Sequence, residues 1–375
     1  MTSKNLFFKA MKEDMRHKLW MAALSVLGNF LALPVGYMVW RSEVLKNCGD
    51  VERILTQGGN YLQHILEDII GFCAGYVIAG GGLVAIVLAV ITGLGGFRYV
   101  FHRNMADTYH SLPIRRNMLY AVGYINGIMI WIIPFIINLL VMFFMAWRLL
   151  GQLGGGGRIW ELAAEMFLDI LVLLVIYLLV YHVVLLSVML SGNVLNTMFS
   201  ILLLGFGAIG LYGLFIAYFD AYLGTYSSQA VDISLAAYIS PLSAVPYLLV
   251  MKFDGVRGWY LWRGILFCVV QVILFGVASR RLYRRRASEV AEQGIWNKRT
   301  ASVFRILTGT AAGMAGWAFF VLLLSDSRAA GWGIFGAVLG AAGVFGVLDI
   351  MFEMDFKAFF AHKKQMAGTV GAALL

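Results

Sequence analysis

A run of fifty residues without a charged side chain, Ile170 to Phe219, constrains this chain more than any other feature. It contains two membrane-length apolar stretches, Leu171 to Met189 and Thr197 to Phe219, which flank the short polar segment Ser191-Gly192-Asn193. A helix of roughly 20 apolar residues crosses the hydrocarbon core and satisfies its own backbone hydrogen bonds. The run therefore predicts two membrane-spanning helices joined by a tight turn, and the chain is predicted to be an integral membrane protein.

The composition supports this class. Apolar residues make up 61% of the chain and charged residues 13%, which leaves too little polar surface to cover a soluble globule. Basic residues near the N-terminus precede a full-length apolar stretch with no small-residue cleavage site after it, so we expect a retained anchor and not a signal peptide. The cysteines Cys48, Cys73 and Cys268 are too few and too scattered for a disulfide framework or a metal cluster, and we expect structural roles for them.

Six further low-charge stretches complete the predicted spans. They are Leu19 to Trp40, Ile69 to Phe97, Asn117 to Trp147, Trp259 to Ser279, Ile306 to Ser325 and Ala329 to Leu348. With the two spans above, the sequence predicts an all-α polytopic membrane protein with about eight transmembrane helices.

Loop charges predict the orientation, because lysine and arginine are retained on the cytoplasmic side. An eight-span path with a cytoplasmic N-terminus places 20 of the 29 basic residues inside and 12 of the 20 acidic residues outside. The net charge of +9 is then explained by membrane topology and not by nucleic-acid binding. We expect a multi-pass protein of the plasma membrane.

The loop between the second and third spans carries the main functional signal. Phe101, Met105, Tyr109 and Leu112 are spaced to share one helical face, whereas Arg103, Asp107 and His110 share another. Pro113 ends this pattern, and Arg115 and Arg116 precede the third span. The periodicity predicts a short amphipathic helix on the inner membrane surface, and by itself it favours an ordinary interfacial helix that tethers the loop.

The same residues carry a family resemblance. The pattern Phe101, Arg103, Asp107, Tyr109, Leu112-Pro113 and Arg116, followed by Tyr120 and an apolar span, resembles the first coupling helix of type-2 ATP-binding cassette (ABC) permeases. Tyr238-Ile-Ser-Pro-Leu242 and Tyr283-Arg-Arg-Arg-Ala-Ser-Glu289 are similar to segments of the multi-span permeases found beside ATPase subunits in Gram-positive bacteria. Glu292 departs from that pattern, in which we expect a glycine.

The resemblance implies a domain layout. It comprises a cytoplasmic amphipathic elbow helix (1–18), a six-span permease core (19–282) with a coupling helix (98–113) and an outer loop (220–258), a basic cytoplasmic linker (283–305) and two extra spans (306–350). Residues 351–375 follow as a cytoplasmic segment and the start of a possible further span. Met366 to Leu375 is too short to cross a bilayer, so we expect either a ninth span cut short or a tail at the interface.

The resemblance also implies partners. Such a permease pairs with a second permease subunit, identical or different, and each rests on a cytoplasmic ATPase that closes on ATP and pushes the coupling helix. The chain contains no Gly-x-x-x-x-Gly-Lys-Ser/Thr motif, so we expect no catalytic residues and no cofactor in this chain, with ATP and Mg²⁺ on the partner ATPase. We expect bacterial origin and export of a hydrophobic or amphipathic substrate such as a drug, peptide or lipid.

Several weaker patterns complete the expectations. The apolar middle of the outer loop, Leu235 to Met251, predicts short helices that re-enter or lie on the outer membrane face, and the resemblance implies a gate there. The basic cluster Arg280, Arg281, Arg284, Arg285 and Arg286 either binds acidic groups or anchors the topology. Glycines at small-xxx-small spacing in the last two spans predict a tight hairpin, and Gly80-Gly81-Gly82 predicts close packing or a hinge.

Polar residues within the spans are candidates for a substrate path. They are Asn138, His182 and Gln271, and for His182 a hydrogen bond to a neighbouring helix is the simpler interpretation. An ion-coupled secondary transporter is the competing hypothesis, although Ile170 to Phe219 contains no carboxylate and the chain shows no internal repeat. A structural or sensory membrane subunit that transports nothing is the other alternative.

Overall fold

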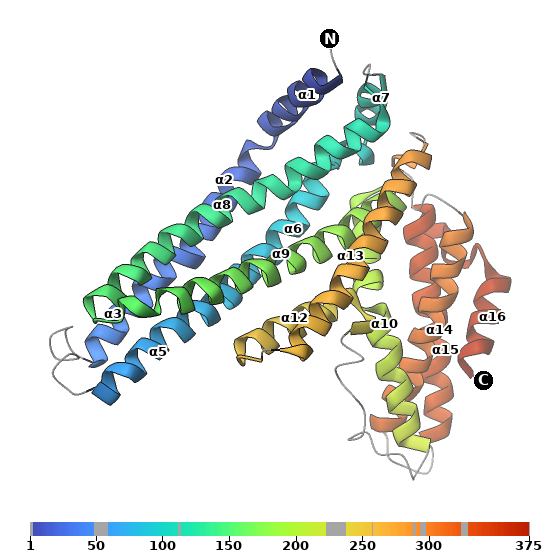
Figure 1. The fold of residues 1–375 in the computed structure, drawn as a ribbon. Helices are drawn as coiled ribbons and strands as arrows, with labels where there is room; N and C mark the ends of the chain where they lie inside the picture. The colour runs from blue at the N-terminus through green and yellow to red at the C-terminus, as the bar shows by residue number, and fades with distance from the viewer. Residues whose placement is uncertain are drawn as a thin grey trace. The chain divides into compact units, whose positions relative to one another are not determined.

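The structure is a computed structural model that describes residues 3–48, 59–111, 114–222, 238–256, 258–287, 290–292, 298–323 and 329–374. Every regular element in these ranges is helical (Figure 1). Of the sequence expectations, Leu112, Pro113 and much of the outer loop and the basic linker lie outside the described residues.

Eight helical segments in the described part of the chain are long and apolar enough to span a membrane, which confirms the predicted fold class. They are Leu19–Lys46, Tyr61–Gly96, Arg116–Gln152, Gly156–Leu190, Val194–Phe219, Trp259–Arg285, Ala301–Val321 and Ala330–Glu353. Five of these segments contain the whole predicted stretch and extend beyond it, because polar end residues continue the helix where hydropathy has already fallen. The second and the eighth segment each lack one predicted end residue, Phe97 and Ala329, and the seventh ends at Val321, whereas its predicted end, Ser325, lies outside the described residues.

The chain divides into two compact units that do not follow chain order. Unit 1 comprises Met1–Phe97, Pro113–Leu185 and Ala244–Arg280, and unit 2 comprises Arg98–Leu112, Leu186–Ser243 and Arg281–Leu375. The helices α9 (Ile159–Leu190), α12 (Pro241–Phe253) and α13 (Trp259–Arg285) have residues in both units.

The other elements belong to one unit each. Those of unit 1 are α1 (Ser3–His17), α2 (Leu19–Phe30), η1 (Leu31–Val35), α3 (Gly36–Cys48), α5 (Gly59–Tyr76), η2 (Val77–Gly81), α6 (Gly82–Gly96), α8 (Arg116–Gln152) and η4 (Gly156–Arg158). Those of unit 2 are η3 (Arg98–Phe101), α7 (Arg103–Ser111), α10 (Val194–Tyr222), α14 (Lys298–Leu323), α15 (Ala329–Glu353), η7 (Phe356–Phe360) and α16 (Lys363–Leu374).

Aromatic side chains from α8 and α9 form the core of unit 1. The rings of Trp131 and Tyr177 stack with centroids 4.3 Å apart. The Tyr177 hydroxyl donates to the carbonyl oxygen of Gly127 (2.7 Å) and lies 2.8 Å from the Thr92 hydroxyl on α6. Buried hydroxyls that are bonded in this way hold three spans in one register.

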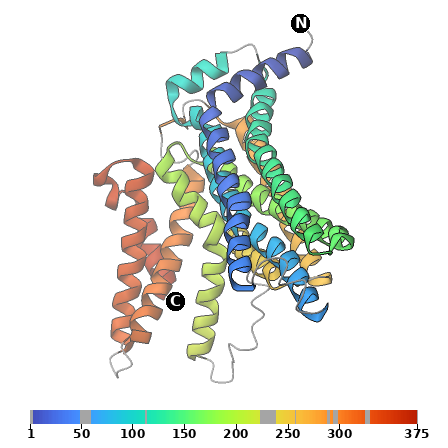
Figure 2. The ribbon, with the colours of Figure 1, turned by 90° about the vertical axis from the view of Figure 1, so that its left-hand side faces the viewer.

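The predicted elbow helix is present as α1, which turns sharply into α2 (Figure 2). Asp14 fixes this turn, because its Oδ2 accepts from Lys18 Nζ and from Asn126 Nδ2 on α8, both at 2.6 Å. Burial lowers the pKa of Lys18, and its ion pair with Asp14 opposes that shift.

The first two spans each contain a π-helical turn. Pro34 lies in η1, and Gly80 and Gly81 lie in η2, so the expected glycine-rich point is a local widening of the helix. The two turns pack together, since a Cβ atom added at Gly80 would lie 3.3 Å from the carbonyl oxygen of Ala32. Close packing is therefore the immediate role of this glycine.

In unit 2 the last two spans form the expected tight hairpin, with α16 beside them (Figure 1). A Cβ atom added at Gly340 would clash with the carbonyl oxygen of Ala312, and one added at Gly309 would lie 2.8 Å from Thr369 Cγ2. Gly343 is the exception to the predicted stripe, because an added Cβ atom there meets no other atom within 4 Å. The tail that we expected as either a cut-short span or an interfacial segment is helical and packs on α14 and α15.

The expected short helix of the outer loop is present as α12. Ala244 and Leu248 on it are fully buried, whereas Val250 and Phe253 are exposed, so contacts with protein explain only part of its apolar sequence. A Cβ atom added at Gly82 on α6 would lie 2.8 Å from Leu249 Cδ2, so α12 packs against the second span.

Candidate functional site

The short helix expected between the second and third spans is present as α7, but it begins two residues later than the predicted pattern. Phe101 lies in the preceding 3₁₀ turn η3 and is buried, with 4% of its surface exposed. The 3₁₀ turn rotates about 120° per residue instead of 100°, so Phe101 does not continue the helical face of Met105. Ala106 is the buried residue of α7, and Met105 is 48% exposed.

Most of the polar side chains of α7 are exposed. The exposed residues on it are Arg103, Asn104, Asp107, Thr108 and Ser111, and Tyr109 is half-buried. Arg115 and Arg116 are exposed at the start of α8. The helix therefore has an exposed polar face that carries both charge signs.

Three tyrosines connect α7 to the end of α13. The rings of Tyr99 and Tyr109 stack with centroids 4.4 Å apart. The hydroxyls of Tyr99 and Tyr283 lie 2.8 Å apart, and both side chains are buried. Movement of α7 would therefore act directly on the last turn of α13.

Arg286 joins the same region to the end of α9. Its Nη1 donates to the carbonyl oxygens of Val188 (2.7 Å) and Met189 (3.0 Å), and its Nη2 donates to the carbonyl oxygen of Val100 (3.2 Å). These bonds satisfy backbone acceptors that a helix end leaves unpaired. Burial lowers the pKa of Arg286 to about 10, so the side chain keeps its charge at neutral pH. In the sequence, Arg286 is one of five similar arginines in the basic cluster, and only its burial in the structure distinguishes it from the other four.

Glu292 connects α7 to the turn after α9 through its backbone N–H and its side-chain carboxylate. Its N–H donates to the carbonyl oxygen of Gly192 (3.0 Å), and its Oε1 accepts from the backbone N–H of Arg103 (3.4 Å). Its φ is 68°, in the left-handed region that favours glycine. The residue that departs from the expected glycine thus occupies a position where glycine is the unstrained choice.

The three candidates for a substrate path have separate surroundings. Asn138 donates to the carbonyl oxygen of Pro134 on its own helix (2.8 Å). His182 contacts the carbonyl oxygen of Leu178 (2.6 Å) and the Tyr124 hydroxyl on α8 (3.2 Å), and Gln271 is buried on α13. The contact with Tyr124 is the neighbouring-helix hydrogen bond that we expected for His182.

The sequence did not indicate two buried groups of paired charges. Lys252 on α12 forms ion pairs with Glu165 and Asp169 on α9, and Arg305 on α14 pairs with Asp349 on α15. Asp169 and Asp349 are fully buried. Each partner is distant in sequence, so no local pattern indicated the pairs.

No family model, curated protein or solved structure matches this chain. Within the residues that the structure describes, no group of three or more His, Cys, Asp or Glu side chains is arranged to hold a metal ion.

Proposed function

We propose that this multi-pass membrane protein is the permease subunit of an ABC transporter. In this proposal it exports a hydrophobic or amphipathic substrate, and a separate cytoplasmic ATPase drives it through α7. ATP and Mg²⁺ would bind the ATPase, and a second permease subunit would complete the transporter. The support is the motif resemblance at residues 101–116 together with the way in which α7 is attached.

The attachment of α7 is the observation that carries this proposal. An interfacial tether would have the same exposed polar face, but it needs only apolar contacts with the membrane on its other side. Here α7 has an exposed polar face, and its other contacts lead through Tyr99, Arg286 and Glu292 to the ends of α9 and α13. A force applied to the exposed face would therefore reach two spans through directed hydrogen bonds.

Ion-coupled secondary transport is the second candidate, and the buried carboxylates favour it. Intramembrane carboxylates are typical of proton and ion pathways. Asp169 and Asp349 are each paired with a basic side chain, which gives them a structural role in the described state. Transport that persists without ATP, driven by an ion gradient, would favour this alternative.

The first prediction concerns ATPase association. Reversing the two basic charges in the double variant Arg103→Glu/Arg116→Glu should reduce recovery of a co-expressed partner ATPase at least about fivefold, because attraction between these two positions and acidic groups of the ATPase would become repulsion. The measurement is co-purification of the two chains from mild detergent, with ATPase activity of the complex as a second readout.

A matched reversal serves as the control. Lys363→Glu/Lys364→Glu changes the net charge by the same amount at two exposed lysines of α16. It should leave recovery of the ATPase unchanged. Equal recovery from both double variants, or equal loss, contradicts the assignment of α7 as the ATPase contact.

A further inference from the structure

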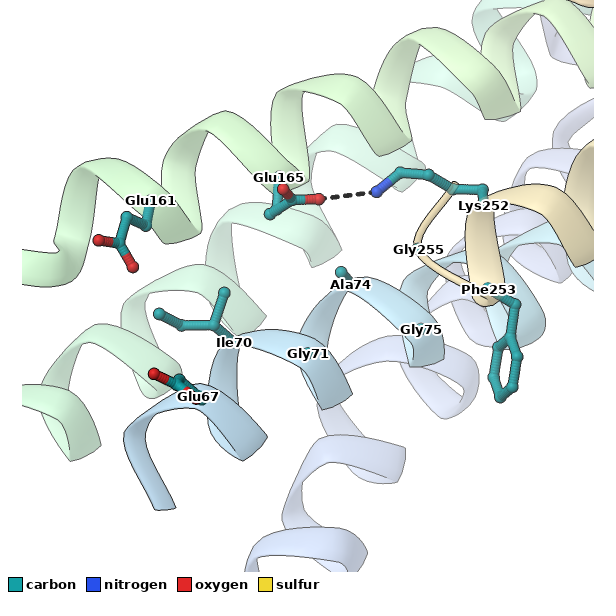
Figure 3. A pocket seen from close by; sticks show the side chains of 10 residues that line it. All are labelled: Glu67, Ile70, Gly71, Ala74, Gly75, Glu161, Glu165, Lys252, Phe253 and Gly255. Carbon is teal, nitrogen blue, oxygen red and sulfur yellow. Dashed lines mark hydrogen bonds and ion pairs between the residues drawn. The ribbon is translucent and has the colours of Figure 1, made fainter. Parts of the chain in front are cut away.

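A cavity of about 270 Å³ opens between α5, α9 and α12, within unit 1 (Figure 3). Glu161 and Glu165 line it from α9, Glu67 lines it from α5, and Lys252 and Phe253 line it from the end of α12. The predicted orientation places this end of the unit on the outer side of the membrane.

The charges around the cavity do not balance. Among the described residues, three carboxylates line it, those of Glu67, Glu161 and Glu165, and Lys252 is the basic side chain that lines it with them. Arg158 Nη2 lies 3.3 Å from Glu67 Oε1, and Arg158 Nε lies 3.8 Å from Glu161 Oε2. Lys252 Nζ lies 2.8 Å from Glu165 Oε2 and 3.1 Å from Oδ1 of the buried Asp169. Within the described residues the acidic groups outnumber the basic ones, which favours a cationic occupant.

Lys252 places an organic ammonium group beside these carboxylates within the protein itself. Its side chain is 3% exposed, and its alkyl stem brings an ammonium group to Glu165 and Asp169 inside the protein. The wall beside it is apolar or small, with Ile70, Gly71, Ala74 and Gly75 on α5. An apolar wall beside anionic groups fits an organic cation better than a metal ion, because a metal ion needs oxygen ligands on all sides.

The space beside α5 is open on both sides of Gly71. A Cβ atom added at Gly71 would meet no other atom within 4 Å. A neighbouring cavity of about 460 Å³ shares Glu67 and Gly71 and is lined by the stacked rings of Trp40 and Phe72, with centroids 4.1 Å apart. Aromatic faces next to carboxylates are a favourable environment for an organic cation.

We propose that this cavity binds the ammonium or guanidinium group of an amphipathic organic cation, with the apolar part of the ligand along α5 and the Trp40–Phe72 pair. If the protein is an exporter, this cation would be its cargo, and only that role rests on the proposed function. Binding to the chain alone tests the site separately, because it requires no ATPase.

The experiment measures binding of phenethylammonium to the full chain in lipid nanodiscs, by calorimetry, with 2-phenylethanol as the neutral probe of similar shape. We expect phenethylammonium to bind at least about tenfold more tightly than the alcohol. Glu161→Gln should weaken binding of the cation about two- to fivefold, as expected for a partly exposed charge pair, and leave the alcohol unaffected.

A filled cavity provides the sharpest control. Gly71→Leu should abolish binding of the cation, whereas Gly210→Leu, at a helical glycine of α10 that also has no neighbour within 4 Å of an added Cβ, should leave it unchanged. Equal binding of the alcohol and the cation, or undiminished binding to a folded Gly71→Leu variant, overturns the site. Loss of ATPase association with intact cation binding would overturn the export function alone.

Discussion

Glu292 carries a conformational cost that its neighbours compensate. A left-handed conformation costs an L-amino acid roughly 1–2 kcal/mol relative to the right-handed one. Its backbone N–H and its carboxylate bond to Gly192 and Arg103, respectively. Its contacts with α7 and with the turn after α9 hold Glu292 in this conformation, so the local backbone strain lies within the candidate coupling region.

At this scale we predict that glycine is the better residue. The Glu292→Gly variant should be more stable than Glu292→Ala by about 1 kcal/mol, because both lose the carboxylate but only glycine loses the Cβ strain. Thermal unfolding of the two variants in the same detergent measures the difference. An alanine variant as stable as the glycine variant would show that the backbone there is relaxed.

In the hairpin of α14 and α15, glycines let the two helix backbones come into direct contact. In a bilayer such close packing replaces the hydrophobic effect as the force between helices. The sequence predicted a stripe of glycines on α15, but two residues three positions apart, Gly340 and Gly343, have opposite surroundings. Both glycines fit the small-xxx-small spacing, and only the position of α14 determines that Gly340 is closely packed and Gly343 is not.

At this scale a matched pair of substitutions tests the packing. Gly340→Leu should destabilise the protein by at least about 2 kcal/mol, because the new side chain meets the backbone of Ala312. Gly343→Leu should change stability by less than about 0.5 kcal/mol, since its surroundings are open. Denaturation midpoints of the two variants provide the comparison, and similar losses from both would contradict this helix register.

For the whole molecule, the predicted orientation follows from the distribution of lysine and arginine. An even number of spans separates the N-terminus from α7, and one span, α8, separates α7 from η4, the 3₁₀ turn with Gly157 at the start of the fourth span. The two sites should therefore lie on opposite sides of the membrane, with α7 on the cytoplasmic side.

Single cysteines can report this orientation. In a Cys48→Ser background, Cys73 and Cys268 are buried, so an added cysteine should dominate labelling. Gly157→Cys should react with a membrane-impermeant maleimide in intact cells, and Met105→Cys only after the cells are opened, because both positions are exposed. The reverse pattern would place α7 outside and remove its access to a cytoplasmic ATPase.

The eight spans, the amphipathic segment between the second and third, and the tight last hairpin could all be predicted from the sequence. These follow from local hydropathy and spacing, which act within one or two helical turns. It also predicted that His182 would bond to a neighbouring helix, because a buried imidazole needs a partner.

Which charged residues are buried, and which groups they pair with, depends on how the helices pack and could not be predicted from local patterns. Arg286 and its four arginine neighbours are alike in sequence, yet Arg286 alone among the five is buried, on carbonyl oxygens from distant segments. Lys252 likewise meets Glu165 across 87 positions of the chain. Such partners come together only when helices pack, so the linkage beneath α7 and the acidic cavity were not available from local patterns.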